Sequence, residues 1–378
     1  MKKFFMFAAM ASVALVSCVK NEPAITGSEN GTEILFETPV LSPSVKAATE
    51  YHNDFNKNIQ IGLWARWYGT YTEGNISTEG VFEYTTFDEG ELYMGKAQGG
   101  LPITYNETFN AWKHQSKNYY WPKNGSLTFN AYAPYNAKNA ALANNTPTGI
   151  TFTNYVVPTT PSQQEDLLYS ERVYNKTAID ADPTTPYKGV ALPFNHALSS
   201  IQFKVKTAAD FSTTQLTLTK IELLNVVSKG SFNQSLVDGN NKTAEDGVWT
   251  LSTDPGDKVI YSVDIPEGGI LLDPTDYRWA ENGTYDKNTA SNGLRETDLI
   301  LLPQPLANCD LRITYKLIND QMSDPITIQL TTDLTAAAVP AWLEGRRYTY
   351  LVTIGLDEIY FEPIVTPWEN HDVTQNEY

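Results

Sequence analysis

Residues 194–205 read FNHALSSIQFKV, and this stretch indicates the fold class of the 378-residue chain. From its middle onward apolar and polar side chains alternate, so that Ile201, Phe203 and Val205 share one face. A period of two places successive side chains on opposite faces of an extended strand. We therefore predict a β-strand with one face in a core and the other in water.

Similar strand signals occur on both sides of this stretch. The chain contains 22 Tyr, 15 Phe and 8 Trp, which favour strands, and Gly, Pro, Asn and Asp divide it into short runs. Further strands are predicted at residues 60–68, 81–86, 127–132, 150–156, 221–227, 259–263, 311–316, 326–330 and 348–354. A helical pattern is seen at residues 163–174 and 333–338. The predicted fold class is all-β.

The first eighteen residues predict export. Two lysines precede an apolar run at residues 4–16, and LVSC at residues 15–18 closes it, an order typical of a bacterial lipoprotein signal peptide. We predict that residues 1–17 are removed and that the Cys18 thiol carries a diacylglycerol, with an acyl chain such as palmitate on the new amino terminus. The alternative is an ordinary secretory signal with a chance cysteine. Residues 18–32 are predicted to form a tether.

Composition narrows the classes of partner. The formal net charge of −17 repels phosphate backbones, so nucleic-acid binding is not expected. The chain has two cysteines, Cys18 and Cys309. Lipidation of the first would exclude an intramolecular disulfide, and Cys309 is then expected to be a packed thiol.

The length of the chain predicts two domains. Residues 180–186 are polar and proline-rich without a periodic pattern, so we predict a boundary near residue 186. The predicted units are residues 33–186 and residues 187–378, the second ending in a terminal strand and a polar tail. A long exposed loop is predicted at residues 273–298.

Several motifs resemble one family. They are YYWP at 119–122, LTFNAYAPY at 127–135, QEDLLYS at 164–170, the stretch at 194–205, IELLNV at 221–226, KGSF at 229–232, GRRYTY at 345–350 and Trp368. Their order resembles the fimbrillin-like proteins of Bacteroidales, the type V pilins. The resemblance implies two tandem transthyretin-like Greek-key β-sandwiches. It also implies a structural subunit of a fimbria on the outer membrane and partnership with other fimbrillin subunits.

The resemblance also implies a mode of assembly. In this family a protease cuts after a basic residue beyond the first strand, and a neighbouring subunit supplies a replacement strand. The corresponding leader strand here contains Ile34, Leu35 and Phe36. The cut would fall between Lys46 and Ala47, where the family usually has arginine. The lysine argues against an arginine-specific protease and leaves a lysine-cutting or a trypsin-like one open. An exposed lysine in a protein that is never processed is the alternative.

The carboxyl end supplies a candidate donor strand. Residues 358–365 read as an extended strand, and its apolar side chains include Ile359, Phe361 and Ile364. Pro363 lacks an N–H, so it favours an edge position or a strand end. Whether this strand is donated or stays in its own subunit is open, as is the choice between stalk, tip and anchor subunit.

The residues predict no enzyme and no cofactor. The four histidines are not at metal-ligand spacing, and no nucleophile elbow or phosphate loop is present in the sequence. Residues 238–243 read as a hairpin loop rather than a calcium loop because Lys242 stands where an oxygen ligand is needed. The alternative function is a monomeric, anchored glycan-binding lipoprotein that stacks sugars on Trp279, Tyr277 and Tyr285. Adhesion to a host protein or glycan is open in both cases.

Overall fold

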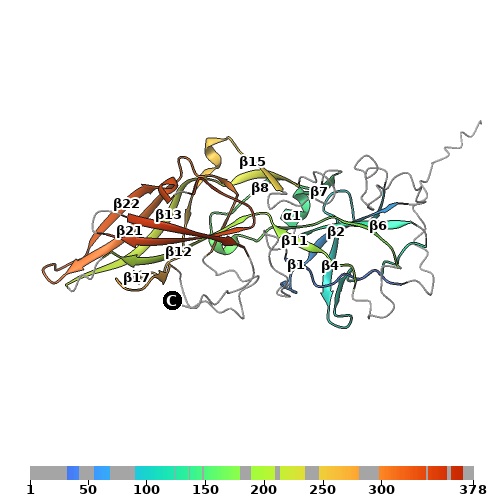
Figure 1. Ribbon diagram of the computed structural model, residues 1–378, viewed down its shortest axis with the longest axis horizontal. Helices are drawn as coiled ribbons and strands as arrows, with labels where there is room; N and C mark the ends of the chain where they lie inside the picture. The colour runs from blue at the N-terminus through green and yellow to red at the C-terminus, as the bar shows by residue number, and fades with distance from the viewer. Residues whose placement is uncertain are drawn as a thin grey trace, which may run out of the picture.

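The computed structural model shows an elongated molecule with two lobes (Figure 1). It describes residues 32–41, 55–68, 90–123, 125–135, 137–146, 149–178, 189–208, 213–234, 247–280, 298–337, 339–355 and 359–368. In these ranges strands predominate, which confirms the all-β prediction. The strand predicted at residues 81–86 lies outside them. Within the described residues, no helix has both the length and the apolar character needed to cross a membrane.

A nine-stranded sheet forms the centre of one lobe. Its pairs are antiparallel except for the parallel pair of β1 and β11. In order across the sheet the strands are β1 (Val40–Leu41), β11 (Pro193–His196), β9 (Leu168–Ser170), β6 (Ser126–Ala133), β2 (Ile61–Tyr68), β4 (Leu101–Asn106) and β5 (Ala111–Lys113), with β3 (Glu91–Met94) on β2 and β10 (Val173–Lys176) on β6. Every residue of β6 is buried, so this strand lies inside the lobe.

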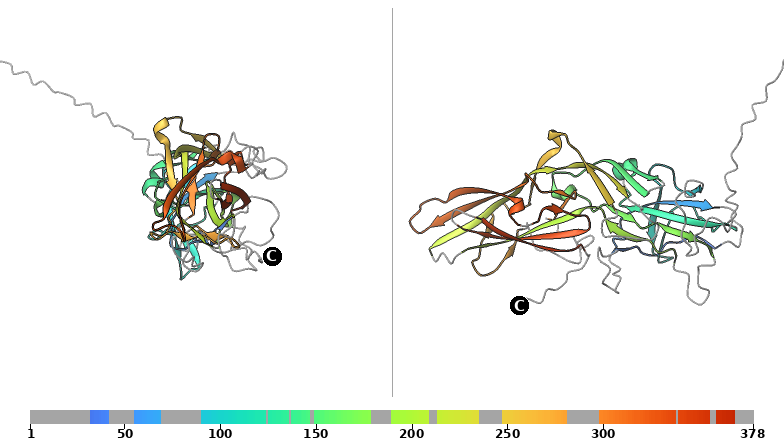
Figure 2. Two further views of the ribbon diagram at one scale, coloured as in Figure 1. Left: turned by 90° about the vertical axis from the view of Figure 1, so that its left-hand side faces the viewer. Right: turned by 45° about the horizontal axis from the view of Figure 1, so that its top comes forward.

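Two five-stranded sheets form the other lobe (Figure 2). One contains β18 (Arg278–Trp279), β12 (Ser199–Thr207), β24 (Arg346–Ile354) and β25 (Ile359–Pro367), with β19 (Leu299–Leu301) also on β12. The other contains β16 (Lys258–Ser262), β13 (Thr214–Val227), β21 (Asp310–Asn319) and β22 (Ile326–Asp333), with β17 (Ile270–Leu271) on β13. β12 and β24 are parallel, whereas the pairs of the second sheet are antiparallel.

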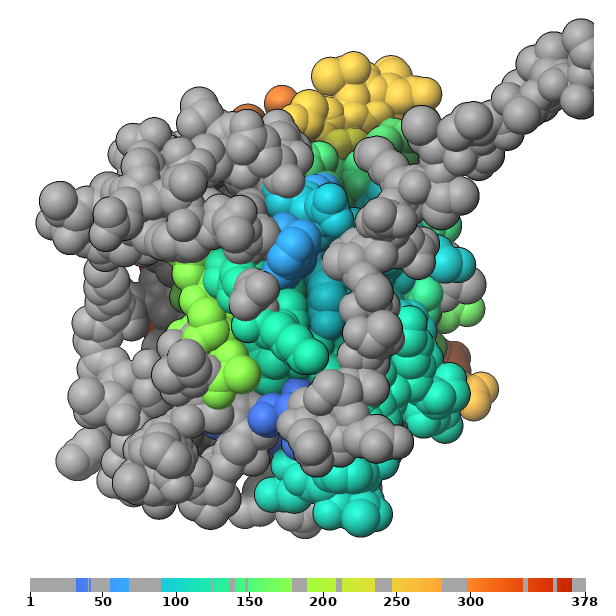
Figure 3. All heavy atoms as spheres, turned by 90° about the vertical axis from the view of Figure 1, so that its right-hand side faces the viewer, coloured from blue at the N-terminus to red at the C-terminus, as the bar shows by residue number. Residues whose placement is uncertain are grey.

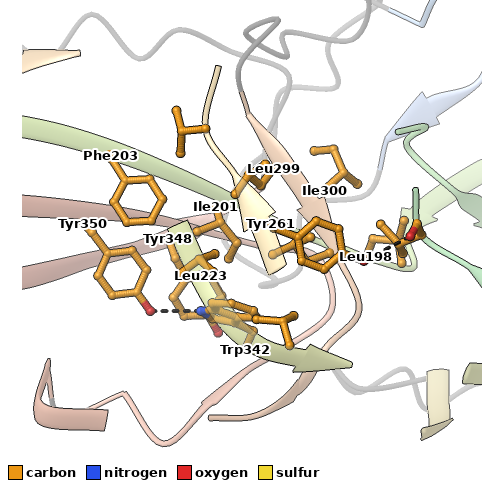
Figure 4. Close-up of a cluster of buried hydrophobic side chains, with 14 of the residues drawn as sticks. Leu198, Ile201, Phe203, Leu223, Tyr261, Leu299, Ile300, Trp342, Tyr348 and Tyr350 are labelled. Carbon is orange, nitrogen blue, oxygen red and sulfur yellow. Dashed lines mark hydrogen bonds between the residues drawn. The ribbon is translucent and has the colours of Figure 1, made fainter. Parts of the chain in front are cut away.

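The core of this lobe follows from the alternation in the sequence. Phe203 of β12 stacks on Tyr350 of β24 at a centroid distance of 5.5 Å. The Tyr350 hydroxyl accepts a hydrogen bond from Trp342 Nε1 at 2.9 Å (Figure 4). Leu223 of β13 faces them in the same cluster of buried side chains. The two sheets therefore pack face to face, as in a β-sandwich.

A four-stranded sheet joins the two lobes. It contains β15 (Gly247–Leu251), β14 (Lys229–Gln234), β8 (Gly149–Val156) and β7 (Ala143–Thr146). β7 and β8 precede residue 186, whereas β14, which pairs with β8, and β15 follow it. β11 also follows residue 186 and pairs in the nine-stranded sheet. Strand pairing therefore crosses the predicted domain boundary in both directions, and residue 186 itself lies outside the described residues.

The remaining elements are short. They are α1 (Ala137–Leu142), 3-10 turns at Pro161–Gln163, Pro255–Asp257 and Leu334–Ala337, and the pair β20 (Gln304–Pro305) and β23 (Ala341–Trp342). The helical turn predicted near residue 333 is present as a 3-10 turn. The helix predicted at residues 163–174 is wrong, because β9 and β10 lie there. Residues 167–170 are all buried, and so short an apolar run does not distinguish a helix from a buried strand.

Candidate functional site: a buried amino-terminal segment and an edge strand

Residues 32–41, which we call the leader segment, lie between two other segments of the chain. On one side Phe36 and Trp112 exchange both backbone hydrogen bonds, at 2.9 and 2.8 Å, and Ile34 N–H donates to Tyr119 O at 2.7 Å. On the other side Val190 N–H donates to Leu35 O at 2.7 Å. We call this position the leader slot. Because both backbone edges are used, the segment is an interior strand although it comes first in the described chain.

The side chains of the leader segment complete a hydrophobic core. Ile34 is 2% exposed and Phe36 is fully buried, whereas Leu35 between them is half-buried. The Phe36 ring meets Phe129 of β6 edge-on at 5.3 Å. In the end-on view a small dark-blue patch of the leader segment is visible beside the teal segments of residues 90–135 (Figure 3). The predicted leader residues therefore belong to the core cluster of this lobe.

An ion pair adds a polar contact at the start of the slot. Glu33 Oε1 lies 2.5 Å from Lys113 Nζ, and the two side chains are only 17% and 9% exposed. Lys113 Nζ also donates to Asn118 Oδ1 at 3.0 Å. Since a buried ammonium is costly without a carboxylate, Lys113 favours an acidic residue at the position of Glu33.

A glycine permits the close approach of the leader backbone. Gly189 has a φ of +119°, a region that side chains rarely adopt. A Cβ placed on it would lie 2.7 Å from the carbonyl carbon and oxygen of Leu35. Any strand that occupies the leader slot therefore passes directly over this glycine.

The predicted donor strand, β25, is an edge strand. Among the described residues it pairs with β24 alone. Ile359 and Phe361 are partly buried against the core, whereas Tyr360 and Val365 are 55% and 47% exposed. Ile364 lies opposite Thr349 and hence on the outer face, so the three predicted donor residues do not share one face.

Trp368 holds the end of β25 in place. It is 1% exposed, and its ring stacks on His196 of β11 at 4.1 Å with an interplanar angle of 8°. His196 Nδ1 lies 2.9 Å from Asp166 Oδ1. His196 is therefore a buried core residue, 2% exposed, and no sequence pattern indicated that it meets Trp368 and Asp166. Asp166 lies within the segment expected to be helical, and it precedes β9.

The aromatic residues of the predicted sugar platform have neighbours of their own. Lys204 Nζ lies 4.3 Å from the Trp279 ring centroid, and Lys206 Nζ lies 4.5 Å from that of Tyr277. The Tyr277 hydroxyl is also 2.9 Å from Thr353 Oγ1. These contacts fasten both aromatics to the sheet, whereas Tyr285 lies outside the described residues.

The remaining predicted sites divide into described and undescribed residues. Cys18, Lys46 and Ala47 lie outside the described ranges, as do His52, His371 and the loop at 238–243. Cys309 is buried, and burial raises the pKa of its thiol to about 11. The described residues contain no group of three or more His, Cys, Asp or Glu placed to hold a metal ion.

Comparison with known proteins identifies the family. The model of the fimbrillin-like family matches residues 47–368. Among solved structures, a fimbrial protein from Bacteroides vulgatus ATCC 8482 has 15% identity and a TM-score of 0.57, over 89% of this chain and 99% of that one. A proposed cell adhesion protein from Bacteroides uniformis ATCC 8492 has 15% identity and a TM-score of 0.49, over 89% and 98%.

The tip fimbrial protein Mfa3 from Porphyromonas gingivalis, with a C-terminal truncation, has 8% identity and a TM-score of 0.35, over 89% of this chain and 100% of that one. No protein with a curated function matches this chain. The structural similarity to the Bacteroides vulgatus protein shows that the two chains share a fold. The match to the family model covers most of the sequence. The chain belongs to the fimbrillin-like family.

Proposed function

We propose that this protein is a structural subunit of a cell-surface fimbria and that neighbouring subunits join by strand exchange. Membership of the fimbrillin-like family supports the fimbrial role. The observation that carries strand exchange is the leader segment. It completes a core and a ladder of hydrogen bonds, yet it lies on the amino-terminal side of the predicted cut after Lys46.

The proposed sequence of events starts from a lipid-anchored precursor. Cys18 carries the lipid and holds the exported protein at the outer membrane. Hydrolysis of the Lys46–Ala47 peptide bond then leaves the leader segment bound by non-covalent contacts alone. Its departure would uncover the backbone groups of Trp112, Tyr119 and Val190 and an apolar pocket above Phe129. Unpaired backbone groups beside an apolar pocket are a strong template for another strand.

The candidate donor is β25 of a neighbouring subunit. It is an edge strand with one partner strand among the described residues, and its inner apolar face is only partly buried. It therefore loses less on leaving its own sheet than a central strand would lose. Joined in this way, each subunit presents one slot and one strand, which suits a linear polymer.

The alternative function, glycan binding by an anchored monomer, has weaker support. Sugar stacking needs an accessible aromatic face. One face of the Trp279 ring is covered by Lys204, and one face of the Tyr277 ring is covered by Lys206.

Two measurements on protein extracted from native cells test the proposal. Terminal sequencing or intact mass gives the start of the chain, and gels with and without boiling report the oligomeric state. We expect a start at Ala47 and a heat-sensitive ladder. A lipidated Cys18 with a single monomer band would contradict a polymerising subunit and leave an anchor subunit or a glycan-binding lipoprotein. Loss of polysaccharide binding by Trp279→Ala would then favour the latter.

A further inference from the structure

The leader segment and the C-terminal strand share a sequence pattern. Residues 33–37 read EILFE, and residues 358–362 read EIYFE. Over the nine aligned positions 33–41 and 358–366, five residues are identical, namely Glu, Ile, Phe, Glu and Val in that order. The two segments lie at opposite ends of the chain and in different sheets, so the match does not reflect one shared environment.

The matching residues also face the same way in both places. Ile34 and Phe36 are directed into the core of their lobe, with exposed fractions of 2% and 0%. Ile359 and Phe361 are the corresponding residues of β25, and both pack on the core of the other lobe. Tyr360 between them is exposed, as expected for a side chain on the outer face.

We infer the register in which β25 of a second copy of this chain fills the leader slot: Ile359 takes the place of Ile34, and Phe361 takes the place of Phe36. This inference rests on the proposed function, which supplies the donor strand, since the slot is open only after the leader segment has left. It adds the residue that fills each position. Phe361 then meets Phe129 edge-on, as Phe36 does in the precursor.

Other registers fit the slot poorly. A shift by one residue turns Tyr360 and Glu362 into the core and sends Phe361 outward, because side chains alternate. A shift by two in one direction places Pro363 at the position of Phe36, whose N–H donates to Trp112 O. Proline has no N–H to make that bond. The opposite shift by two places the acidic Asp357 in the pocket of Ile34.

In the inferred register Pro363 takes the place of Thr38. The Thr38 N–H donates no hydrogen bond to another described residue, so a proline there forfeits none of the contacts described above. The same register brings Glu362 to the place of Glu37, whose N–H donates to Val190 O at 3.0 Å. The ladder on both sides of the slot is thus kept.

The charge at the start of the slot agrees with this register. Lys113 is nearly buried, and the carboxylate that neutralises it comes from Glu33. Without the leader segment the ammonium would keep Asn118 and the face of the Phe109 ring as neighbours but lose the carboxylate. In the sequence Glu358 stands where Glu33 stands in the leader. The incoming strand therefore supplies a replacement carboxylate to Lys113.

A peptide-binding experiment tests the donor and the register. Full-length protein is cleaved at Lys46 and freed of its leader, and it is then titrated with synthetic peptides of residues 32–41 and 358–367. We expect both to bind. Phe361→Ala in the second peptide should weaken binding at least 100-fold, whereas Tyr360→Ala should change it less than threefold.

The ion pair gives an independent readout of the register. Glu358→Gln in the peptide should weaken binding about tenfold to the wild-type protein and much less to the Lys113→Gln protein. Such coupling appears only if the two side chains meet. Binding of the 32–41 peptide to the Lys113→Gln protein checks that its slot is intact.

Each failure has a separate meaning. Binding of the leader peptide without binding of the 358–367 peptide overturns the inference and leaves strand exchange with a different donor. Equal effects of Phe361→Ala and Tyr360→Ala, or no coupling between Glu358 and Lys113, overturn the register. If neither peptide binds, the slot cannot be refilled, and the proposed function and the inference both fail.

Discussion

The leader segment and the segment that contains β25 share five of nine aligned residues in different surroundings. The leader segment has hydrogen-bonded neighbours on both sides and buries Phe36 fully. Among the described residues β25 pairs with β24 alone, and Phe361 is only partly buried. The difference shows that burial here is a property of the slot rather than of the strand. A strand with this pattern gains contacts by moving from an open edge to a two-sided slot.

The point at which each segment is fastened also differs. The leader segment is hydrogen-bonded on both sides, whereas β25 pairs with β24 along its whole length but on one side only, and Trp368 is buried just beyond its end. Release of β25 therefore breaks one ladder, whereas release of the leader segment breaks two. This arrangement suits a strand that is stored on its own subunit before it is used elsewhere.

The largest expected effect comes from removing the Phe36 side chain while the leader segment stays in the precursor. Phe36→Ala removes a fully buried ring and should lower the free energy of unfolding by about 3–5 kcal/mol. Phe361→Ala should cost the same precursor clearly less, because its ring is only partly buried. Urea denaturation of the two variants measures both values. Equal losses would contradict the difference between the two environments.

The next largest effect is expected at the end of β25. Trp368→Ala removes the stack on His196 and should lower the free energy of unfolding by up to about 3 kcal/mol, less than for a central tryptophan because the strand end can detach. Hydrogen exchange should show faster exchange at residues 359–367, and Trp368→Phe should restore most of the protection. Unchanged exchange in that strand would show that Trp368 does not hold it.

A glycine substitution sharpens the comparison without altering either strand. Gly189→Ala places a Cβ against the Leu35 backbone and forces a positive φ on alanine, which should cost about 1–3 kcal/mol. It should also weaken refilling of the slot by any strand. Gly268→Ala is the matched control, because a Cβ there meets no atom within 4 Å. Thermal unfolding of both variants is sufficient, and similar stabilities would contradict a tightly closed slot.

The smallest expected effect concerns an ion pair in the C-terminal lobe. Its contribution to stability should not depend on the leader segment, so it serves as a reference. The Arg312 Nε–H donates to Glu222 Oε2 at 2.7 Å, and this hydrogen bond holds the pKa of the Glu222 carboxyl below its ordinary value, assisted by Lys220 and opposed by burial. A lowered pKa in the folded state contributes stability above the unfolded pKa of about 4.3, and this contribution is lost as the pH falls through the folded pKa.

Glu222→Gln should therefore flatten the acid side of the stability profile, measured as the urea midpoint between pH 3 and pH 7. The flattening should be equal in the intact and the leader-free protein. A change that depends on the leader segment would mean that the two lobes are coupled through this pair.

The sequence predicted the parts of the fold that depend on local alternation. β12, β21 and β24 lie where period-two patterns placed them, and the motifs indicated the family. The helix expected at residues 163–174 failed because Leu167 and Leu168 belong to a fully buried run, which lacks the period that separates helix from strand. The contacts of β11 with the leader segment and with Trp368 join residues far apart in the chain. No local pattern reports such pairings.

The candidate site was predicted in part. The leader residues Ile34 and Phe36 and the strand at 359–367 could be marked from their apolar alternation and from the family resemblance. The role of Gly189 and the pairing of Glu33 with Lys113 could not, because both depend on which backbones meet. The repeated pattern EILFE and EIYFE was visible in the sequence, but its meaning needs the inward direction of Ile34 and Phe36, which the structure provides.

The structure of the assembled fimbria, determined by electron cryomicroscopy at a resolution that shows side chains, tests the central claim most directly. The account predicts a strand from a neighbouring subunit in the leader slot, with Phe361 against Phe129, Ile359 in the place of Ile34 and Glu358 at Lys113. A slot that still holds residues 32–41, or that holds a different strand or register while β25 remains on β24, would contradict it.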